Sequence, residues 1–272
     1  VSEFPAPVLH SLHGIFKACH VGGVGLKGPK ALPISSFNFC FRILHVALVS
    51  STDAEMQDSA MSVLKLHADP ALEVARAQML HALYSYLQRM PGRIEKVRTL
   101  MEQLCAGLQS EELESALQGL INTSPLVRGA TLSALPHVPA LANGSVAQDA
   151  SIASLLLLAK HDSNQENAEI ALQVLELYGH DIGEDTTPCI LEYLADRHEN
   201  VRVSASAALA EVVERHPTHL QGTLTQIFTA YITASKNVQH REGLALGLGA
   251  LGPMLTEREL PVVTTFLTTR AF

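Results

Sequence analysis

Two stretches of the sequence hold residue types that could bind a nucleotide or a phosphate. Residues 247–252, Gly-Leu-Gly-Ala-Leu-Gly, have the spacing of the G-x-G-x-x-G dinucleotide fingerprint, which works where a strand turns into a helix. Residues 241–246 already run with helical period, which favours a glycine-lined helix that packs closely on a neighbour. The glycine-rich run 22–28 contains Lys27 but lacks the Gly-Lys-Ser/Thr ending of a phosphate-binding loop, which favours a mobile connector.

Metal-binding and catalytic patterns are equally weak. The residues that could be taken for metal ligands are His10, His13, Cys19 and His20. Their spacing matches no zinc pattern, so we predict no metal and no cofactor. The sequence has neither a G-x-S-x-G elbow nor an H-E-x-x-H motif. The carboxylates at Glu111, Glu112 and Glu114 favour a helix N-terminus over an acid/base pair. We therefore expect no enzyme and no small-molecule substrate.

The charge is uneven along the chain. Residues 1–100 carry ten Lys and Arg against seven Asp and Glu, whereas residues 101–272 carry nine against twenty. An acidic segment repels phosphate, so any polyanion contact should lie in the first hundred residues. Basic residues cluster there around the turn at residues 90–92: Arg89, Arg93, Lys96 and Arg98. The alternative is a solvated helix start with ordinary surface charge.

The sequence predicts a cytoplasmic protein without a membrane contact. It has no basic segment followed by a short apolar core, and no apolar run of about 18 residues. The cysteines are scattered, as is typical of reduced, buried thiols: Cys19, Cys40, Cys105 and Cys189. Because the chain starts with Val1 and not with Met, we expect an excised piece of something longer.

An all-α fold is predicted from composition and periodicity. Trp is absent, aromatic residues make up 5% of the chain, and a break rich in Gly and Pro spans residues 21–33. Short connections between helices favour antiparallel helical hairpins. Helices are expected at 37–50, 53–67, 70–89, 93–108, 111–121, 125–141, 146–161, 164–178, 185–195, 199–215, 218–234, 238–255 and 257–269.

One short pattern recurs along these helices. An apolar pair occurs at residues 47–48, 82–83, 134–135, 174–175, 208–209 and 247–248, with spacings of 35, 52, 40, 34 and 39 residues. These spacings are near those of HEAT and armadillo units, and the interval of 52 indicates an extra helix. We compare the residue six positions before each of the last four pairs, and three of these four positions hold an arginine, at Arg128, Arg202 and Arg241.

Residues 196–209, D-R-H-E-N-V-R-V-S-A-S-A-A-L, resemble the turn and second helix of a HEAT repeat. A single helical hairpin cannot bury its own apolar stripe, so the copies indicate a stack. We therefore predict that residues 1–272 are an α-solenoid of HEAT repeats. The resemblance implies that Asp196, Arg128, Arg202 and Arg241 reach toward the next repeat and have a structural role.

The order of motifs in the last third is more specific. Residues 201–217, 224–231, 241–246 and 254–255, followed by Phe266-Leu267, resemble a segment of the large ribosome-associated general-control translational activator family, just upstream of its elongation-factor-three-like region. One departure is the short connection between Tyr231 and Arg241, where that family is expected to carry an insertion.

This resemblance implies a non-catalytic cytoplasmic scaffold. The full-length protein would associate with the ribosome and support activation of the kinase that phosphorylates translation initiation factor two during amino-acid starvation. The first alternative is a HEAT or armadillo adaptor in transport or chromatin, unrelated to translation. The second is a nucleic-acid-binding HEAT enzyme, which the acidic balance and the missing Trp disfavour because such proteins need basic grooves and stacking aromatic residues.

Overall fold

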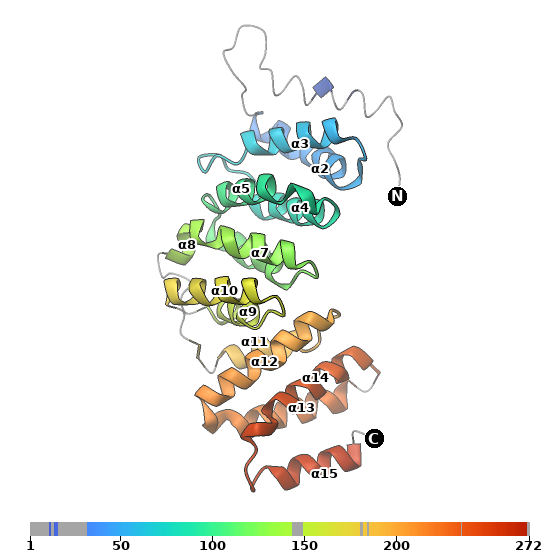
Figure 1. Ribbon diagram of the computed structural model, residues 1–272, viewed down its shortest axis with the longest axis vertical. Coiled ribbons are helices and arrows are strands. Elements are labelled where there is room, and N and C mark those ends of the chain that lie inside the picture. The colour runs from blue at the N-terminus through green and yellow to red at the C-terminus, as the bar shows by residue number, and fades with distance from the viewer. Residues whose placement is uncertain are drawn as a thin grey trace. The chain divides into compact units, whose positions relative to one another are not determined.

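A computed structural model describes residues 11, 14, 15, 32–142, 149–179, 182–183, 185–234 and 236–270. Its regular elements within these ranges are helices, without a strand (Figure 1). The chain divides into two compact units, one formed by residues 1–119 and 133–143 and the other by residues 120–132 and 144–272. The predicted connector at 22–28 and the residues His10, His13, Cys19 and His20 lie outside the described residues, as does most of the 21–33 break.

The first unit is built from five longer helices and several short ones. Its elements are α2 Ile34–Ser50, α3 Ala54–Leu66, α4 Arg76–Arg89, η1 Pro91–Arg93, α5 Ile94–Cys105, α6 Ser110–Leu117, η3 Leu135–His137 and α8 Pro139–Ala142. Helix α4 packs against α2, α5 and α6. The predicted extra helix in the 52-residue interval is confirmed, because both α5 and α6 lie between the two apolar pairs that bound this interval.

The second unit repeats a helical hairpin. Its longer helices are α9 Ala150–Lys160, α10 Gln165–Tyr178, α11 Thr186–Tyr193, α12 Glu199–Arg215, α13 Leu220–Thr233, α14 Val238–Leu251 and α15 Leu260–Arg270. The chain enters the unit through η2 Gln118–Ile121 and α7 Pro125–Ala134, and short turns lie at η4 Pro217–His219 and η5 Gly252–Met254. Helices α9 and α10, α11 and α12, and α13 and α14 pack as successive pairs (Figure 1).

Side-chain caps fix where several of these helices begin. Asp53 Oδ1 accepts the N–H groups of Glu55 and Met56 at the start of α3. Asp149, Asn164 and Asn237 cap α9, α10 and α14 in the same way. Each cap satisfies N–H groups that have no partner inside the helix.

The recurring apolar pairs lie in the cores of the two units. Ala47 and Leu48, Ala82 and Leu83, and the later pairs through Leu248 are all buried. In the second unit, Ala208, Leu209 and Leu248 join a core that extends from Leu157 to Val263. This confirms the predicted fold class, an all-α solenoid of stacked antiparallel helical hairpins. The extent of one continuous solenoid over residues 1–272 stays a prediction.

The sequence analysis gets several helix bounds wrong, two of them because proline ends the helix. The helix expected from Pro70 begins at Arg76, and Pro70 lies in the preceding turn. The single helix expected over 125–141 is interrupted at η3, where Pro136 lacks the N–H that a continuous helix needs. The helix expected to reach Leu255 ends at Leu251, before Pro253.

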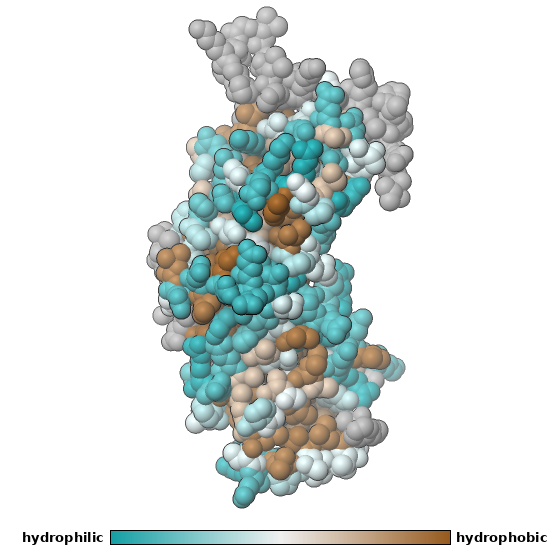
Figure 2. Space-filling view, in the orientation of Figure 1, coloured by the Kyte–Doolittle hydropathy of each residue, from teal (hydrophilic) through white to brown (hydrophobic). Residues whose placement is uncertain are grey.

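Part of the surface is apolar. Figure 2 shows apolar residues gathered on one face over the region of α13 to α15, and the large exposed apolar residues of these helices include Ile232, Val238, Leu260 and Val262. Within the described ranges, every helix is too short or too polar to cross a membrane.

Candidate functional site

Arg128 holds together the turn before its own helix and the turn of the following repeat. Its Nη1 donates to the carbonyl oxygens of Asn122 and Thr123 at 2.8 and 3.2 Å. Its Nε and Nη2 each lie 2.6 Å from a carboxylate oxygen of Asp162, in a bidentate pair. The two side chains are 6% and 3% exposed. Arg128 therefore acts as a buried clamp between α7 and the turn that precedes α10.

The electrostatics of Asp162 follow from this clamp. Burial alone would raise the pKa of the Asp162 carboxyl. Hydrogen bonds from the Arg128 guanidinium, the Asn164 N–H and the Asn167 amide outweigh burial and lower the pKa below its ordinary value. The charged carboxylate is thus the stable form in the folded chain.

Arg202 makes the corresponding contacts two repeats further along. Its Nη1 donates to the carbonyl oxygens of Asp196 and Arg197 in the turn before α12, and its Nη2 lies 2.7 Å from Oε2 of Glu242 in α14. In the repeat that contains α14, the sequence position that corresponds to Asp162 is Ser235, which has no carboxylate. Glu242 supplies the anion in its place.

The sequence analysis missed a third clamp, Arg76. This side chain is fully buried at the start of α4, and its Nη2 donates to the carbonyl oxygens of Asp69, Pro70 and Leu72. The signal was present, because Arg76 precedes its apolar pair at 82–83 by the same six residues as Arg128 and Arg202 precede theirs.

Arg241 and Asp196 make different contacts from those of the clamps. Arg241 donates to the Tyr231 hydroxyl at 2.8 Å and lies 4.5 Å from the centroid of that ring. Asp196 accepts the backbone N–H of His198 and pairs with its ring within the same turn. In the preceding repeat, the position that corresponds to Arg128 is Ala168. Its side chain is uncharged and cannot form an ion pair with Asp196.

A different ion cluster joins the helices α9 and α12, near the repeat that lacks the arginine. Glu211 of α12 accepts from Lys160 at 2.7 Å, from His161 at 2.8 Å and from Arg215 at 2.6 Å. Burial works to raise the pKa of Glu211, but the hydrogen bonds from Lys160 and His161 outweigh it and lower the pKa. The sequence analysis also missed this cluster, because its members are far apart in the chain.

The four predicted polyanion-binding residues lie on α4, η1 and α5 but do not form one free patch. Arg93 and Lys96 both approach Asp58 of α3 at 3.4 Å, and Arg98 pairs with Glu95 of its own helix at 3.6 Å. Arg89 is exposed at the end of α4. A contact with a polyanion through these residues stays a prediction.

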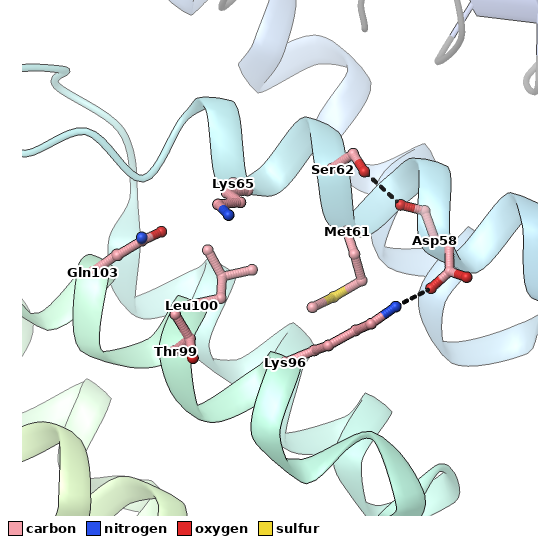
Figure 3. Close-up of a pocket in the computed structure, with 8 residues that line it drawn as sticks. All are labelled: Asp58, Met61, Ser62, Lys65, Lys96, Thr99, Leu100 and Gln103. Atoms are coloured by element: carbon pink, nitrogen blue, oxygen red, sulfur yellow. Dashed lines mark hydrogen bonds and ion pairs between the residues drawn. The ribbon is translucent and has the colours of Figure 1, made fainter.

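A groove opens beside Lys96, between α3 and α5 (Figure 3). Its volume is about 350 Å³, and it is lined by Asp58, Met61, Ser62, Lys65, Lys96, Thr99, Leu100 and Gln103. Met61 and Leu100 are buried, whereas Lys65 and Lys96 are exposed at the rim. The groove therefore combines an apolar floor with a positively charged rim.

The fingerprint at 247–252 lies in the end of α14 and in η5, not between a strand and a helix. A Cβ at Gly247 would lie 2.9 Å from Cδ1 of Leu194. A Cβ at Gly243, one turn earlier, would lie 1.8 Å from the carbonyl oxygen of Leu194. The structure confirms that this glycine-bearing helix packs closely on its neighbours, as the sequence predicts, and the site is not a nucleotide loop.

The remaining candidate groups serve the fold. Glu111 and Glu112 lie in the first turn of α6, as predicted, and Glu112 accepts the Ala77 N–H at 3.2 Å; Glu114 is exposed on the same helix. Cys105 is buried, and burial raises its pKa to about 12; Cys40 and Cys189 are free and half-buried. Within the described ranges, His, Cys, Asp and Glu form no group of three or more that could hold a metal ion.

Comparison with known proteins gives two matches. A family model described as the HEAT repeats of the stalled ribosome sensor GCN1 matches residues 143–272. The protein ILITYHIA of Arabidopsis thaliana is 34% identical over 197 residues, which cover 70% of this chain. The same match covers 7% of ILITYHIA, so the chain is similar to a small part of that protein.

Proposed function

Because residues 143–272 belong to the HEAT-repeat family of the stalled ribosome sensor GCN1, we propose that the chain is a scaffold segment of a translational activator that associates with ribosomes. The full-length protein would act in the cytoplasm and support activation of the kinase that phosphorylates translation initiation factor two during amino-acid starvation. This role comes from the family and from the ordered motifs of the last third.

The observation that supports the scaffold role is that buried arginine side chains bind other parts of the fold. Arg76, Arg128 and Arg202 direct their guanidinium groups into the turns before their own helices, and Arg128 and Arg202 also bind a carboxylate of a neighbouring repeat. Charges buried in this way hold helices in register and are not available for catalysis or ligand binding. A partner would therefore contact the outer surface of the stacked helices, as in other solenoids.

Ribosome co-sedimentation tests the proposal with the full-length protein. We expect deletion of residues 1–272 to lower both ribosome association and kinase activation in starved cells. Unchanged association together with unchanged activation would contradict the proposal. Interaction partners drawn instead from transport or chromosome proteins would favour the adaptor alternative.

The charged surface of the first unit can be tested separately. Replacing exposed Arg89 and half-buried Arg98, in the variant R89E/R98E, is expected to weaken ribosome association more at low salt than at high salt, since surface charges are screened by ions. The control variant K236E/R258E changes the net charge equally on the second unit. Equal sedimentation of both variants would place the contact elsewhere.

A further inference from the structure

The groove between α3 and α5 has the chemistry of a peptide site. Figure 3 shows Met61 and Lys65 extending from α3, and Thr99, Leu100 and Gln103 from α5, around the same space. The buried Met61 and Leu100 supply an apolar floor, and the methionine thioether adapts to different side-chain shapes. The Gln103 amide lines one side and can hydrogen-bond an extended backbone. The Ser62 and Thr99 hydroxyls donate to the Asp58 and Glu95 carbonyl oxygens of their own helices and offer their lone pairs as acceptors.

The charges around the groove do not cancel. Arg93 and Lys96 share the single carboxylate of Asp58, each at 3.4 Å, and the Lys96 side chain is 62% exposed. Lys65 is exposed at the opposite end of the rim, and its ammonium group makes no ion pair with another described residue. The rim is therefore complementary to an occupant with negative charge on both sides of an apolar group.

We propose that this groove binds a short acidic peptide segment of a partner protein. One apolar side chain of the peptide packs on Met61 and Leu100, and flanking carboxylates lie against Lys65 and Lys96. RNA fits the groove less well, because no aromatic residue in the lining can stack on a base and the cations are few. The proposal goes beyond the scaffold function and does not rest on it.

Selection from a displayed library of random heptapeptides tests the inference without a known partner. The bait is the whole 272-residue chain, and the variant K65E/K96Q serves for counter-selection. We expect enrichment of sequences in which Asp or Glu flanks a large apolar residue. Fluorescence polarisation with a selected peptide should show affinity about tenfold weaker for K65E/K96Q than for wild type, because exposed ion pairs are replaced by repulsion.

The control variant K236E/R258Q makes the same change of charge on the second unit and should bind the peptide as wild type does. Circular dichroism should show equal helix content for all variants, since every replaced side chain is exposed. Failure to enrich acidic sequences, equal peptide affinity of K65E/K96Q and wild type, or displacement of the peptide by polyuridine at lower concentration than by unlabelled peptide would each overturn the inference.

Discussion

Breaking the buried pair between Arg128 and Asp162 should be among the most damaging single changes in the second unit. The variant R128M keeps most of the side-chain stem but removes both 2.6 Å hydrogen bonds to the carboxylate and the two bonds to the turn carbonyls. Removing one partner of a buried pair costs about 3–5 kcal/mol. Asp162 keeps donors from Asn164 and Asn167, so we expect about 3 kcal/mol, the lower end of that range.

The pH dependence of this loss has a defined direction. The pKa of Asp162 is lowered in the folded chain, so its contribution to stability is present above the unfolded-state pKa of about 3.9. This contribution is lost as the pH falls through the lowered folded-state pKa. The gap between wild type and R128M should therefore be complete at pH 7 and should narrow in acid, where the carboxyl group becomes neutral.

Urea unfolding followed by circular dichroism measures these differences, with D162N and R128M/D162N completing a double-mutant cycle. The matched control is R98M, whose pair with Glu95 is exposed and should cost less than about 0.5 kcal/mol. A loss below about 1 kcal/mol in R128M at pH 7, or additive effects in the double variant, would refute the clamp.

Two further predictions concern glycines and thiols. G243A should destabilise the chain by about 2 kcal/mol or more, since its Cβ would lie 1.8 Å from the Leu194 carbonyl oxygen. G249A has open space around the added Cβ and should stabilise the helix by up to about 1 kcal/mol. Thermal melting compares the two variants. Burial raises the pKa of Cys105 to about 12, so this thiol should resist iodoacetamide at about pH 8 until the chain unfolds. The half-buried Cys40 and Cys189 should react before Cys105, as mass spectrometry would show.

The fold could be predicted from sequence because its determinants are local and repeated. Small and apolar residues at helical spacing, short connections and the recurring apolar pairs indicate stacked hairpins, and residues such as Ala208 and Leu209 are buried accordingly. One helix bound failed at Pro136, where the apolar periodicity continues past a residue that cannot extend the hydrogen-bond ladder. Another failed at Pro70, where the predicted helix begins only at Arg76.

The partners of the charged residues could not be predicted in the same way. Sequence spacing places Arg93 and Lys96 close together, but only the packing of α3 against α5 brings Asp58 between them. The groove depends on the fold in the same way. Its lining combines residues of α3 and α5, and α4 lies between these two helices in the sequence. Such contacts depend on how side chains of stacked helices meet, which repeat spacing alone does not encode.

Within the second unit, the ionic contacts between repeats are of two kinds. Where a repeat carries Arg128 or Arg202, the arginine closes its own turn and binds an acidic residue of the next repeat, whereas Arg241 contacts Tyr231 within its own hairpin. Where the arginine position is Ala168, the turn aspartate of the next repeat, Asp196, stays within its own turn, and Glu211 joins α12 to α9 through Lys160 and His161. The bidentate arginine–carboxylate pair is thus replaced there by a single carboxylate that Lys160, His161 and Arg215 share.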